Sequence, residues 1–298
     1  MEKMKVTFLG TGNAIPTATR NHTGILASFF NENILIDCGE GIQRQFKIAN
    51  LNPGKISRIL ITHWHGDHIL GLPGLFQTLA MGSYNKTLKI YGPPGTGHYL
   101  ALIEQLIKGL RLNIQVNEIY DGLIEDKLFY IQSKPMFHGT PTNAYSIIIK
   151  DQRHLDKKKI KKLKLPNSPL LGELQAGKDI VFNGKEIKVS SISYIEKGKK
   201  LTVILDTSMN SDAIKLAEKS DLLIAESTFS KDDREKAQEY FHLTSVDAAN
   251  IAKKSKSSRL ILTHISERYE HKLKTIEKEA KKIFKNTKIV KDFDVVRI

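Results

Sequence analysis

The sequence predicts an α/β fold in which two packed sheets carry helices on both outer faces. Short apolar runs rich in β-branched residues indicate buried strands, and the segments between them have apolar residues at three-to-four spacing, as amphipathic helices do. The segment Ser57–His63 recurs almost unchanged as Ser258–His264, which a core built of two similar halves would produce. A chain of 298 residues, 40% of them hydrophobic, can form one large domain or two modest ones. We find no separate domain boundary in the pattern and therefore expect one domain over residues 1–298.

Four of the predicted strands lead directly into side chains that can bind a metal or move a proton. In layered α/β folds, ligands bind beyond the carboxyl ends of the strands, so we expect these side chains to share one site. The strands cover residues 58–62, 201–205, 221–225 and 259–263, and the residues that follow them are His63, Asp206, Glu226 and His264. The helical pattern covers residues 71–81, 98–110, 212–220, 245–254 and 269–285.

The composition is that of a globular protein and excludes a disordered, collagenous or disulfide-rich chain. No apolar run reaches the ~18–20 residues that a membrane span needs, and the N-terminus lacks a charged leader followed by a long apolar stretch. The single cysteine, Cys38, cannot form an internal disulfide, which agrees with a reducing compartment. We therefore expect a cytoplasmic protein with no membrane partner.

The net charge of +14 indicates a polyanionic partner, and nucleic acid is the commonest polyanion in a cytoplasm. A general preference for lysine would spread this charge along the chain. Instead, residues 150–164 hold eight basic and two acidic residues. This run and the Pro-rich stretch that follows it interrupt the strand and helix pattern. We interpret residues 151–180 as an inserted arm that projects from the domain and binds nucleic acid.

The segment His63–His68 is the strongest chemical signal in the sequence. It holds three imidazoles and one carboxylate within six residues, directly after a predicted strand. Imidazole is a favoured ligand of Zn²⁺, and a carboxylate adds negative charge. His63 and His65 alternate and can face one ion, while Asp67 and His68 lie on the turn into the next helix and can face a second ion.

Two metal ions need more ligands than this segment supplies, because an ion that also holds water takes at least three protein ligands. The candidates are His138 and the strand-end residues Asp206 and His264. The two oxygens of an Asp can bridge two cations, and Asp206 is well placed for that role. Two cations ~3.5–4 Å apart can generate hydroxide near neutral pH and stabilise an in-line displacement at phosphorus.

These motifs resemble the metallo-β-lactamase fold and, more narrowly, the tRNase Z (ribonuclease Z) family. The segment His63–His68 is similar to the HxHxDH signature of the fold. The resemblance extends over nearly the whole chain and implies an αβ/βα four-layer sandwich of two mixed sheets with an inserted basic exosite arm. Further matching segments are Phe8–Pro16 with Arg20 and Asn21 (N-terminal loop), Leu35–Gln43 (DCGEGTQ), Thr62–Pro73 (ThxHgDHxxGLP) and Tyr91–Gly95 (GPxG).

The tRNase Z family removes 3′ trailers from precursor tRNA, so the resemblance implies a zinc-dependent endoribonuclease. Hydroxide would attack the phosphorus and leave a 3′-hydroxyl on the tRNA and a 5′-phosphate on the trailer. The resemblance also implies a homodimer with two Zn²⁺ ions per subunit. One ion would be bound by His63, His65 and His138, the other by Asp67, His68 and His264, with Asp206 bridging the two.

Further roles follow from the same resemblance. Asp67 would also orient the hydroxide. His242 and Glu226 stand at the HST and HEAT positions and are expected to protonate the departing 3′-oxygen, although Ala225 replaces the first residue of the HEAT motif. The expected tRNA contacts are Arg20, in a PxKxRN loop whose lysine is replaced by Ala18, and the arm residues Lys157, Lys158, Lys159, Lys161 and Lys162, which would bind phosphates without selecting a sequence.

Other interpretations remain open at this point. The same metals could serve a small-molecule hydrolase acting on a thioester, a lactone or a cyclic nucleotide, but such an enzyme would have no use for the basic arm. A non-catalytic RNA-binding protein would not need a complete ligand set. His242 could be part of a helix cap, Glu226 could only orient a metal-bound histidine, and Trp64 could either pack or contact substrate. We expect Asp37 and Glu40 to hold their loop by hydrogen bonds.

Overall fold

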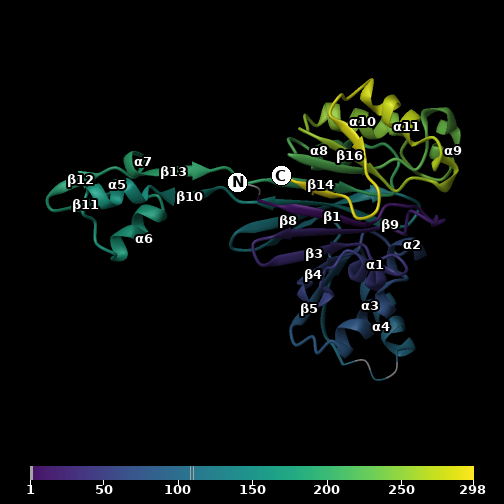
Figure 1. The fold of residues 1–298 in the computed structure, drawn as a ribbon, viewed down its shortest axis with the longest axis horizontal. Helices are drawn as coiled ribbons and strands as arrows, with labels where there is room; N and C mark the ends of the chain where they lie inside the picture. Colours follow the sequence, from purple (N-terminus) through teal and green to yellow (C-terminus); the bar gives the residue numbers. More distant parts are fainter. Residues whose placement is uncertain (1–2, 108, 110) are drawn as a thin grey trace.

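The computed structural model describes residues 3–107, 109 and 111–298, and its main body has four layers (Figure 1). Two seven-stranded sheets pack face to face, and helices cover the outer face of each. Both sheets are mixed, because each combines a parallel half with an antiparallel half. The predicted α/β fold of two mixed sheets is confirmed.

The first sheet is built mainly from the N-terminal half of the chain, in the strand order β18-β1-β2-β3-β4-β5-β6. Its pairing becomes parallel from β3 onwards, because helices connect β3 to β4, β4 to β5 and β5 to β6. The strands are β1 (Lys5–Gly10), β2 (Gly24–Phe29), β3 (Glu32–Ile36), β4 (Arg58–Leu60), β5 (Thr87–Gly92), β6 (Asn113–Glu118) and β18 (Val295–Arg297). The helices are α1 (Ile42–Ile48), η1 (Pro53–Lys55), α2 (Gly66–Ile69), α3 (Leu72–Met81) and α4 (Thr96–Leu106).

The second sheet has the order β17-β16-β15-β14-β9-β8-β7 and repeats this plan in the C-terminal half. Strands β14 to β17 are parallel, and the helices between them cover the outer face. The strands are β7 (Gly122–Glu125), β8 (Phe129–Phe137), β9 (Pro141–Ile149), β14 (Lys200–Ile204), β15 (Leu222–Glu226), β16 (Leu260–Thr263) and β17 (Thr287–Ile289). The helices are α8 (Ser211–Leu216), η2 (Lys231–Asp233), α9 (Arg234–Glu239), α10 (Ser245–Lys254), η3 (Glu267–Tyr269) and α11 (Leu273–Lys281).

Apolar side chains from both sheets fill the space between them. Phe8 and Ile34 enter this core from the first sheet, and Tyr145 and Leu201 enter it from the second; all four are fully buried. The hydroxyl of Tyr145 donates a hydrogen bond of 2.7 Å to the carbonyl oxygen of Ile61. This bond connects β9 with the segment that follows β4, and so fixes the two sheets relative to each other close to the predicted metal ligands.

The repeated sequence segments occupy corresponding places in the two sheets. Strand β4 lies between parallel neighbours in the first sheet and leads to His63, while β16 lies between parallel neighbours in the second sheet and leads to His264. The repeat therefore has a structural reason, because each copy brings a histidine to the carboxyl end of its own sheet.

Some helices are shorter than predicted. Helix α8 ends at Leu216 rather than at residue 220, and Lys219 already has a left-handed φ of 52°. The helix predicted over residues 269–285 begins only at Leu273, after the turn η3, and ends at Lys281. Residues 108 and 110, near the end of the helix predicted over 98–110, lie outside the described residues.

A long arm projects from the main body, at the left of Figure 1. Its stem is the antiparallel pair β10 (Gln152–Leu155) and β13 (Ser193–Glu196), so the arm extends over residues 152–196 and beyond the predicted range of 151–180. The prediction was too short because the pairing of β10 with a strand some forty residues later leaves no local sequence signal. Between these strands lie α5 (Lys157–Lys162), α6 (Pro169–Gln175), β11 (Ile180–Phe182), β12 (Lys185–Ile187) and α7 (Val189–Ile192).

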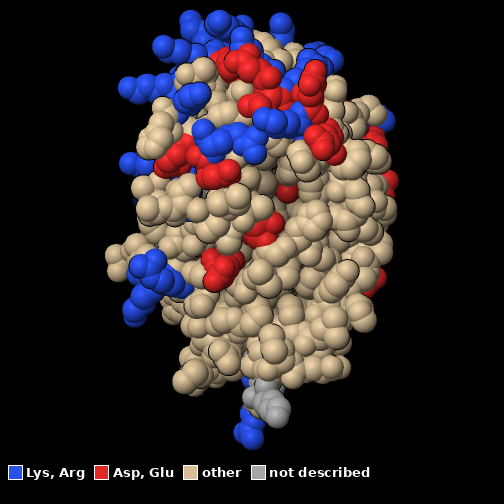
Figure 2. Space-filling model, turned by 90° about the vertical axis from the view of Figure 1, so that its right-hand side faces the viewer, with Lys and Arg blue, Asp and Glu red and all other residues tan. Residues whose placement is uncertain are grey.

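The arm has a small apolar core of its own, formed around Leu165, Leu174 and Ile187. Figure 2 shows the face of the main body that is turned away from the arm: Lys and Arg side chains gather over its upper part, where the C-terminal helices lie, and the lower part carries few charges. Within the described residues, none of the helices combines the length and the apolar character that a membrane crossing requires.

We predict that Leu174→Ala unfolds the arm locally and leaves the main body intact. Leu174 is fully buried in the arm core, and a Leu→Ala change at such a site costs about 2–5 kcal/mol. Hydrogen exchange measured by mass spectrometry should accelerate in residues 152–196 alone. Leu163→Ala, at a site of the same arm that is 41% exposed, is the matched control. Faster exchange throughout both sheets would contradict an independent arm core.

Candidate metal centre

The side chains predicted to bind metal lie together at one edge of the main body, beyond the carboxyl ends of strands from both sheets. They form two groups whose ligand atoms lie within 4.8 Å of one another. The first group is His63, His65 and His138, and the second is Asp67, His68, Asp206 and His264. Each group combines residues that follow β4 with residues that follow strands of the second sheet.

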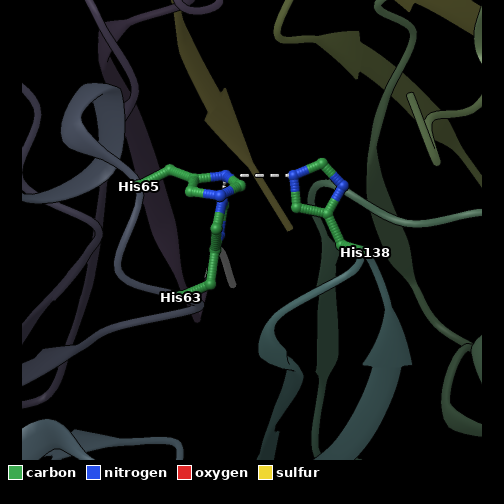
Figure 3. A group of neighbouring side chains, drawn as sticks. All are labelled: His63, His65 and His138. Carbon is green, nitrogen blue, oxygen red and sulfur yellow. Dashed lines mark hydrogen bonds between the residues drawn. The ribbon is translucent and has the colours of Figure 1, made fainter.

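Figure 3 shows the first group, in which the ring of His65 points toward the ring of His138. The Nδ1 atom of His65 lies 3.0 Å from Nε2 of His63 and 3.2 Å from Nε2 of His138. Three nitrogens that bind one tetrahedral ion at ~2.05 Å are roughly 3.3 Å apart. The spacing of the three imidazoles therefore matches ligands that share one ion.

The second group has the same spacing. The Nε2 atoms of His68 and His264 are 3.2 Å apart, and Oδ2 of Asp67 lies 3.3 Å from each of them. The carboxylate of Asp206 completes the group, with Oδ2 at 3.4 Å from Nε2 of His68 and Oδ1 at 3.2 Å from Nε2 of His264. Four ligand atoms at these separations match the corners of a tetrahedron around a second ion.

Asp206 lies between the two groups and belongs to both. Its Oδ2 atom is also 3.6 Å from Nε2 of His63 and 3.5 Å from Nε2 of His138. The side chain is buried, and its Oδ1 atom has no hydrogen-bond donor among the described residues. A buried carboxylate oxygen without a donor is costly unless a cation satisfies it, so the donor set fits a pair of metal ions bridged by Asp206.

Asp37 orients two of the ligands from behind. It lies directly after β3 with a left-handed φ of 57°, and its Oδ2 atom accepts hydrogen bonds from Nδ1 of His68 at 2.6 Å and from the hydroxyl of Thr62 at 2.7 Å. The Thr62 hydroxyl lies 3.0 Å from Nδ1 of His63. A carboxylate that accepts the outer N–H of a ligating histidine fixes its ring and tautomer. Asp37 thus holds its loop by hydrogen bonds, as expected.

Two further residues at the centre have left-handed backbone conformations that side chains rarely adopt. His264 has a φ of 55° immediately after β16, and Phe241, which precedes His242, has a φ of 57°. The carbonyl oxygen of Phe241 lies 3.0 Å from Nδ1 of His138 and accepts its proton, which leaves Nε2 free for a metal. Such conformations cost free energy and persist where the surroundings enforce them.

The electrostatics of the two groups differ. Burial, reinforced by the imidazole of His68, holds the pKa of His63 well below its usual range, so its imidazole remains neutral and one ring nitrogen is free to bind a metal. Burial would raise the pKa of Asp67, but His68 more than compensates and lowers it. Burial would lower the pKa of His68, but Asp206, Asp67 and Asp37 raise it well above its usual range. The negative charge that favours a proton on His68 favours a metal cation in the same way.

His242 and Glu226 form a hydrogen-bonded pair beside the ligands. Nδ1 of His242 donates to Oε1 of the fully buried Glu226 at 3.0 Å. Burial would lower the pKa of His242, but the Glu226 carboxylate raises it to about 9, so the imidazole is protonated at neutral pH. This arrangement suits a general acid. Helix α10 has its own cap, in which the hydroxyl of Thr244 accepts from the backbone N–H of Asp247, so His242 is not needed as one.

Thr207 and Thr228 complete the site. The only indication of them in the sequence is that each lies close to a carboxylate at the end of a strand. The hydroxyl of Thr228 donates to Oε2 of Glu226 at 2.5 Å and accepts the Nδ1 proton of His264 at 2.9 Å. The backbone N–H of Thr207 donates to Oε1 of Glu226 at 2.9 Å. Glu226 therefore orients His242 directly and His264 through Thr228.

The remaining predicted residues lie elsewhere. The five lysines at positions 157–159, 161 and 162 are exposed on α5 of the arm, far from the ligands (Figure 1). Arg20 is only 3% exposed, and its Nη1 donates to the carbonyl oxygen of Val290 at 2.8 Å. This burial does not agree with the predicted substrate contact of Arg20. Trp64 stacks on Tyr99, with 4.8 Å between the ring centroids, which is a packing role.

The metal ligands border a cleft of about 360 Å³ that is open to solvent. Asn13 and Ala14 line one side of it, and Tyr240 and His242 line another. A substrate in this cleft contacts both ligand groups and the imidazole of His242. Two facing mixed sheets with paired His and Asp ligand groups at one edge define a metal-dependent hydrolase of the metallo-β-lactamase fold.

Comparison with known proteins agrees with this class. The metallo-beta-lactamase fold protein YhfI from Bacillus subtilis superposes with a TM-score of 0.73 over 100% of both chains at 22% identity, which shows the fold. The family model described as "Anti-Pycsar protein Apyc1" matches residues 4–155, a range that ends before Asp206, Glu226 and His264.

Relatives that match nearly the whole chain identify its family within this class of hydrolases. The ribonuclease Z of Enterococcus faecalis is 38% identical over 99% of this chain and 97% of its own length. The short form of human tRNase Z has a TM-score of 0.72 and 28% identity, with 98% of each chain covered. The chain belongs to the ribonuclease Z family.

We predict that Asp37→Asn weakens metal binding. The Oδ2 atom of Asp37 accepts from His68 and from the Thr62 hydroxyl, and its Oδ1 atom accepts the backbone N–H of Thr62 at 2.7 Å. An amide group cannot accept at both ends, so His68 or Thr62 loses a partner, and the loss of such a contact lowers metal affinity about 10–100-fold. Titration against a chelator of known affinity measures the change. Glu40→Gln, which removes an exposed carboxylate from the same loop, is the control. Equal affinities for both variants and the wild type would contradict the role of Asp37.

Proposed function

We propose that this chain is an endoribonuclease that removes the 3′ trailer from precursor tRNA in the cytoplasm. The observation that carries the proposal is the position of His242, which is hydrogen-bonded to Glu226 and lines the same cleft as members of the two ligand groups that share Asp206. A phosphodiester in this cleft meets metal ligands and a general acid together. The expected products are a 3′-hydroxyl on the tRNA and a 5′-phosphate on the trailer.

Two Zn²⁺ ions per subunit are the proposed cofactors, because neutral imidazoles and carboxylates are typical zinc ligands and their separations suit tetrahedral coordination. His63, His65 and His138 would hold one ion, Asp67, His68 and His264 the other, and Asp206 both. When bound, such ions supply activated water near neutral pH and neutralise the charge that develops on the phosphate.

The side chains of the chain itself perform the remaining steps. The ionised carboxylate of Asp67 borders the cleft and accepts a hydrogen bond from the attacking water, which orients the water toward phosphorus. The bond from the water oxygen to phosphorus forms as the bond from phosphorus to the 3′-oxygen breaks, and the water gives up one proton to solvent. His242 gives its proton to the departing 3′-oxygen, and Glu226 stabilises the imidazolium beforehand.

The arm supports a large substrate over a small one. Its helix α5 presents Lys157, Lys158, Lys161 and Lys162 to solvent, without an ion pair to any described residue, while Lys159 donates to the carbonyl oxygen of Ser191. Because this helix lies far from the cleft (Figure 1), a substrate that uses both must extend between them. The tRNA body would bind these lysines through its phosphates while its 3′ end lies in the cleft.

We also propose a homodimer in which the arm of one subunit serves the cleft of the other. The lower part of the face in Figure 2 carries few charges, and the side chains of Leu70, Met81 and Leu106 are exposed on the elements of that region. Arg20 would act by positioning the loop in which it lies, since its guanidinium is buried.

Cleavage of a 3′-extended precursor tRNA tests the proposed function. We expect a single cut near the discriminator base that leaves a 3′-hydroxyl, is lost with a chelator and is restored by Zn²⁺. Asp67→Ala should lose cleavage and retain tRNA binding, and Asp212→Ala, at a half-buried site on α8, should retain both. No cut by a folded, zinc-loaded sample would refute the tRNA substrate, and hydrolysis of a small phosphodiester by that sample would favour a small-molecule enzyme.

The pH dependence of cleavage tests whether His242 is the general acid. Activity should fall as the pH rises through the pKa of His242, because only the protonated imidazole can donate. Glu226→Gln removes the charge that raises this pKa, so the fall in activity should move to lower pH. Cleavage at pH 8 should then decrease much more than cleavage at pH 6. The decrease at pH 8 should be about 10²-fold or more, the effect of losing a general acid. Glu239→Gln, which removes an exposed charge from the same cleft, should leave the profile in place. An unchanged profile in Glu226→Gln would exclude His242 as the acid.

A further inference from the structure

Residues 12–21 form a loop at the edge of the cleft, which we call the cleft loop. Asn13 and Ala14, near its start, line the cleft beside the metal ligands. The base of the loop is also joined to the strand end that carries His264, because the backbone N–H of Ile265 donates to the carbonyl oxygen of Thr11 at 3.1 Å. The position of this loop therefore decides which substrates fit against the metal centre.

A single carboxylate, that of Asp292, holds both ends of the cleft loop. Its Oδ1 atom accepts the hydroxyl proton of Thr11 at 2.6 Å, directly before the loop. Its Oδ2 atom accepts the backbone N–H of Asn21 at 2.7 Å, at the end of the loop, and Nε2 of Gln45 at 3.1 Å. The backbone N–H of Gly12 donates to the carbonyl oxygen of Asn21 at 2.9 Å, which closes the base of the loop.

A second carboxylate, that of Glu270, contacts the same loop further along. Its Oε1 atom accepts the hydroxyl proton of Thr19, and its Oε2 atom lies 3.5 Å from Nε of Arg20. The Nη1 atom of Arg20 donates to the hydroxyl of Thr11 at 2.7 Å, so it joins this contact to the one made by Asp292. The two carboxylates come from different parts of the segment that follows His264.

We propose that Asp292 and Glu270 are positioning residues that fix the cleft loop against the metal centre and thereby determine how precursor RNA binds and where it is cut. The inference rests on the proposed tRNA-processing function for its choice of substrate. Neither carboxylate lines the cleft among the described residues, so both act through the loop. Residues 14–16 are exposed, and Ala14 is held by a contact of 3.2 Å between its carbonyl oxygen and Nε2 of His22, so the two carboxylates supply further contacts that fix the loop.

The geometry also explains why a carboxylate serves at position 292. Three donors, the hydroxyl of Thr11, the backbone N–H of Asn21 and the amide of Gln45, converge on the two oxygens of one side chain. An Asn at this position retains one oxygen for Asn21 and Gln45, and its NH₂ group can donate to the Thr11 hydroxyl. An Ala retains none of these contacts. Asp292→Asn should therefore restore part of what Asp292→Ala loses.

The test compares Asp292→Ala, Asp292→Asn and the control Asp294→Ala. Asp294 is a carboxylate two residues further along whose side chain lies 3.8 Å from Nζ of Lys288 and accepts the backbone N–H of Lys291 at 3.3 Å; it acts on Arg20 of the cleft loop only through its charge and has no hydrogen bond to the described residues of that loop. In the absence of RNA, hydrogen exchange in residues 12–21 should be faster in Asp292→Asn than in the wild type and faster still in Asp292→Ala. In the control Asp294→Ala it should stay at the wild-type rate. Cleavage of precursor tRNA by Asp292→Ala, which loses three hydrogen bonds, should show additional cut positions and a KM raised by at least about tenfold, the effect of losing a single hydrogen bond to a charged group.

Hydrolysis of bis(p-nitrophenyl) phosphate and the zinc content separate positioning from general damage. Both should stay within about twofold of the wild type in Asp292→Ala, because the ligands themselves are untouched. A parallel loss of zinc and of both activities, or unchanged exchange in residues 12–21, would overturn the proposal. If Asp292→Ala does not fold, Thr19→Ala gives the same test at the surface by removing the Glu270 contact. A wild type that cuts no precursor tRNA would refute the substrate, and the exchange data would still decide whether these carboxylates hold the loop.

Discussion

The burial of the Asp206 carboxylate is the constraint on which the rest of the site depends. Imidazoles of both ligand groups approach it at 3.2–3.6 Å, and one of its oxygens has no hydrogen-bond donor among the described residues. An isolated buried carboxylate would be strongly unfavourable, so the surrounding side chains must supply positive charge or hold ions that do. The strand ends, the Asp37 network and the left-handed backbone at His264 all serve to place donors around this one group.

The fold and most of the centre could be predicted from local sequence patterns, because strands that end at ligands leave a signal within a few residues. His63, Asp206 and His264 each follow an apolar run, and the structure brings them together. The arm boundary and the burial of Arg20 could not be predicted in this way. Both depend on partners distant in sequence, namely β13 for the stem and the carbonyl oxygen of Val290 for the guanidinium. The threonine contacts of Glu226 likewise become visible only when three strand ends are placed side by side.

Glu226 couples the charge on His242 to the geometry of His264 through one carboxylate. One oxygen accepts a proton from His242, and the other accepts the Thr228 hydroxyl, which in turn holds His264. A change in the charge of Glu226 would therefore alter the imidazolium and the orientation of a metal ligand at the same time. The coupling explains why Glu226, which does not line the cleft, lies fully buried at the centre of the hydrogen-bond network.

The distribution of ligands over the repeated halves has a consequence for the cohesion of the molecule. The first half supplies His63, His65, Asp67 and His68, and the second supplies His138, Asp206 and His264, so each ligand group contains residues from both. Neither half can complete a coordination shell alone. Each bound ion would consequently act as a cross-link between the two sheets, and its binding free energy would add to the stability of their interface. By this linkage the availability of metal in the cell governs how firmly the two halves stay together, as well as whether the site reacts.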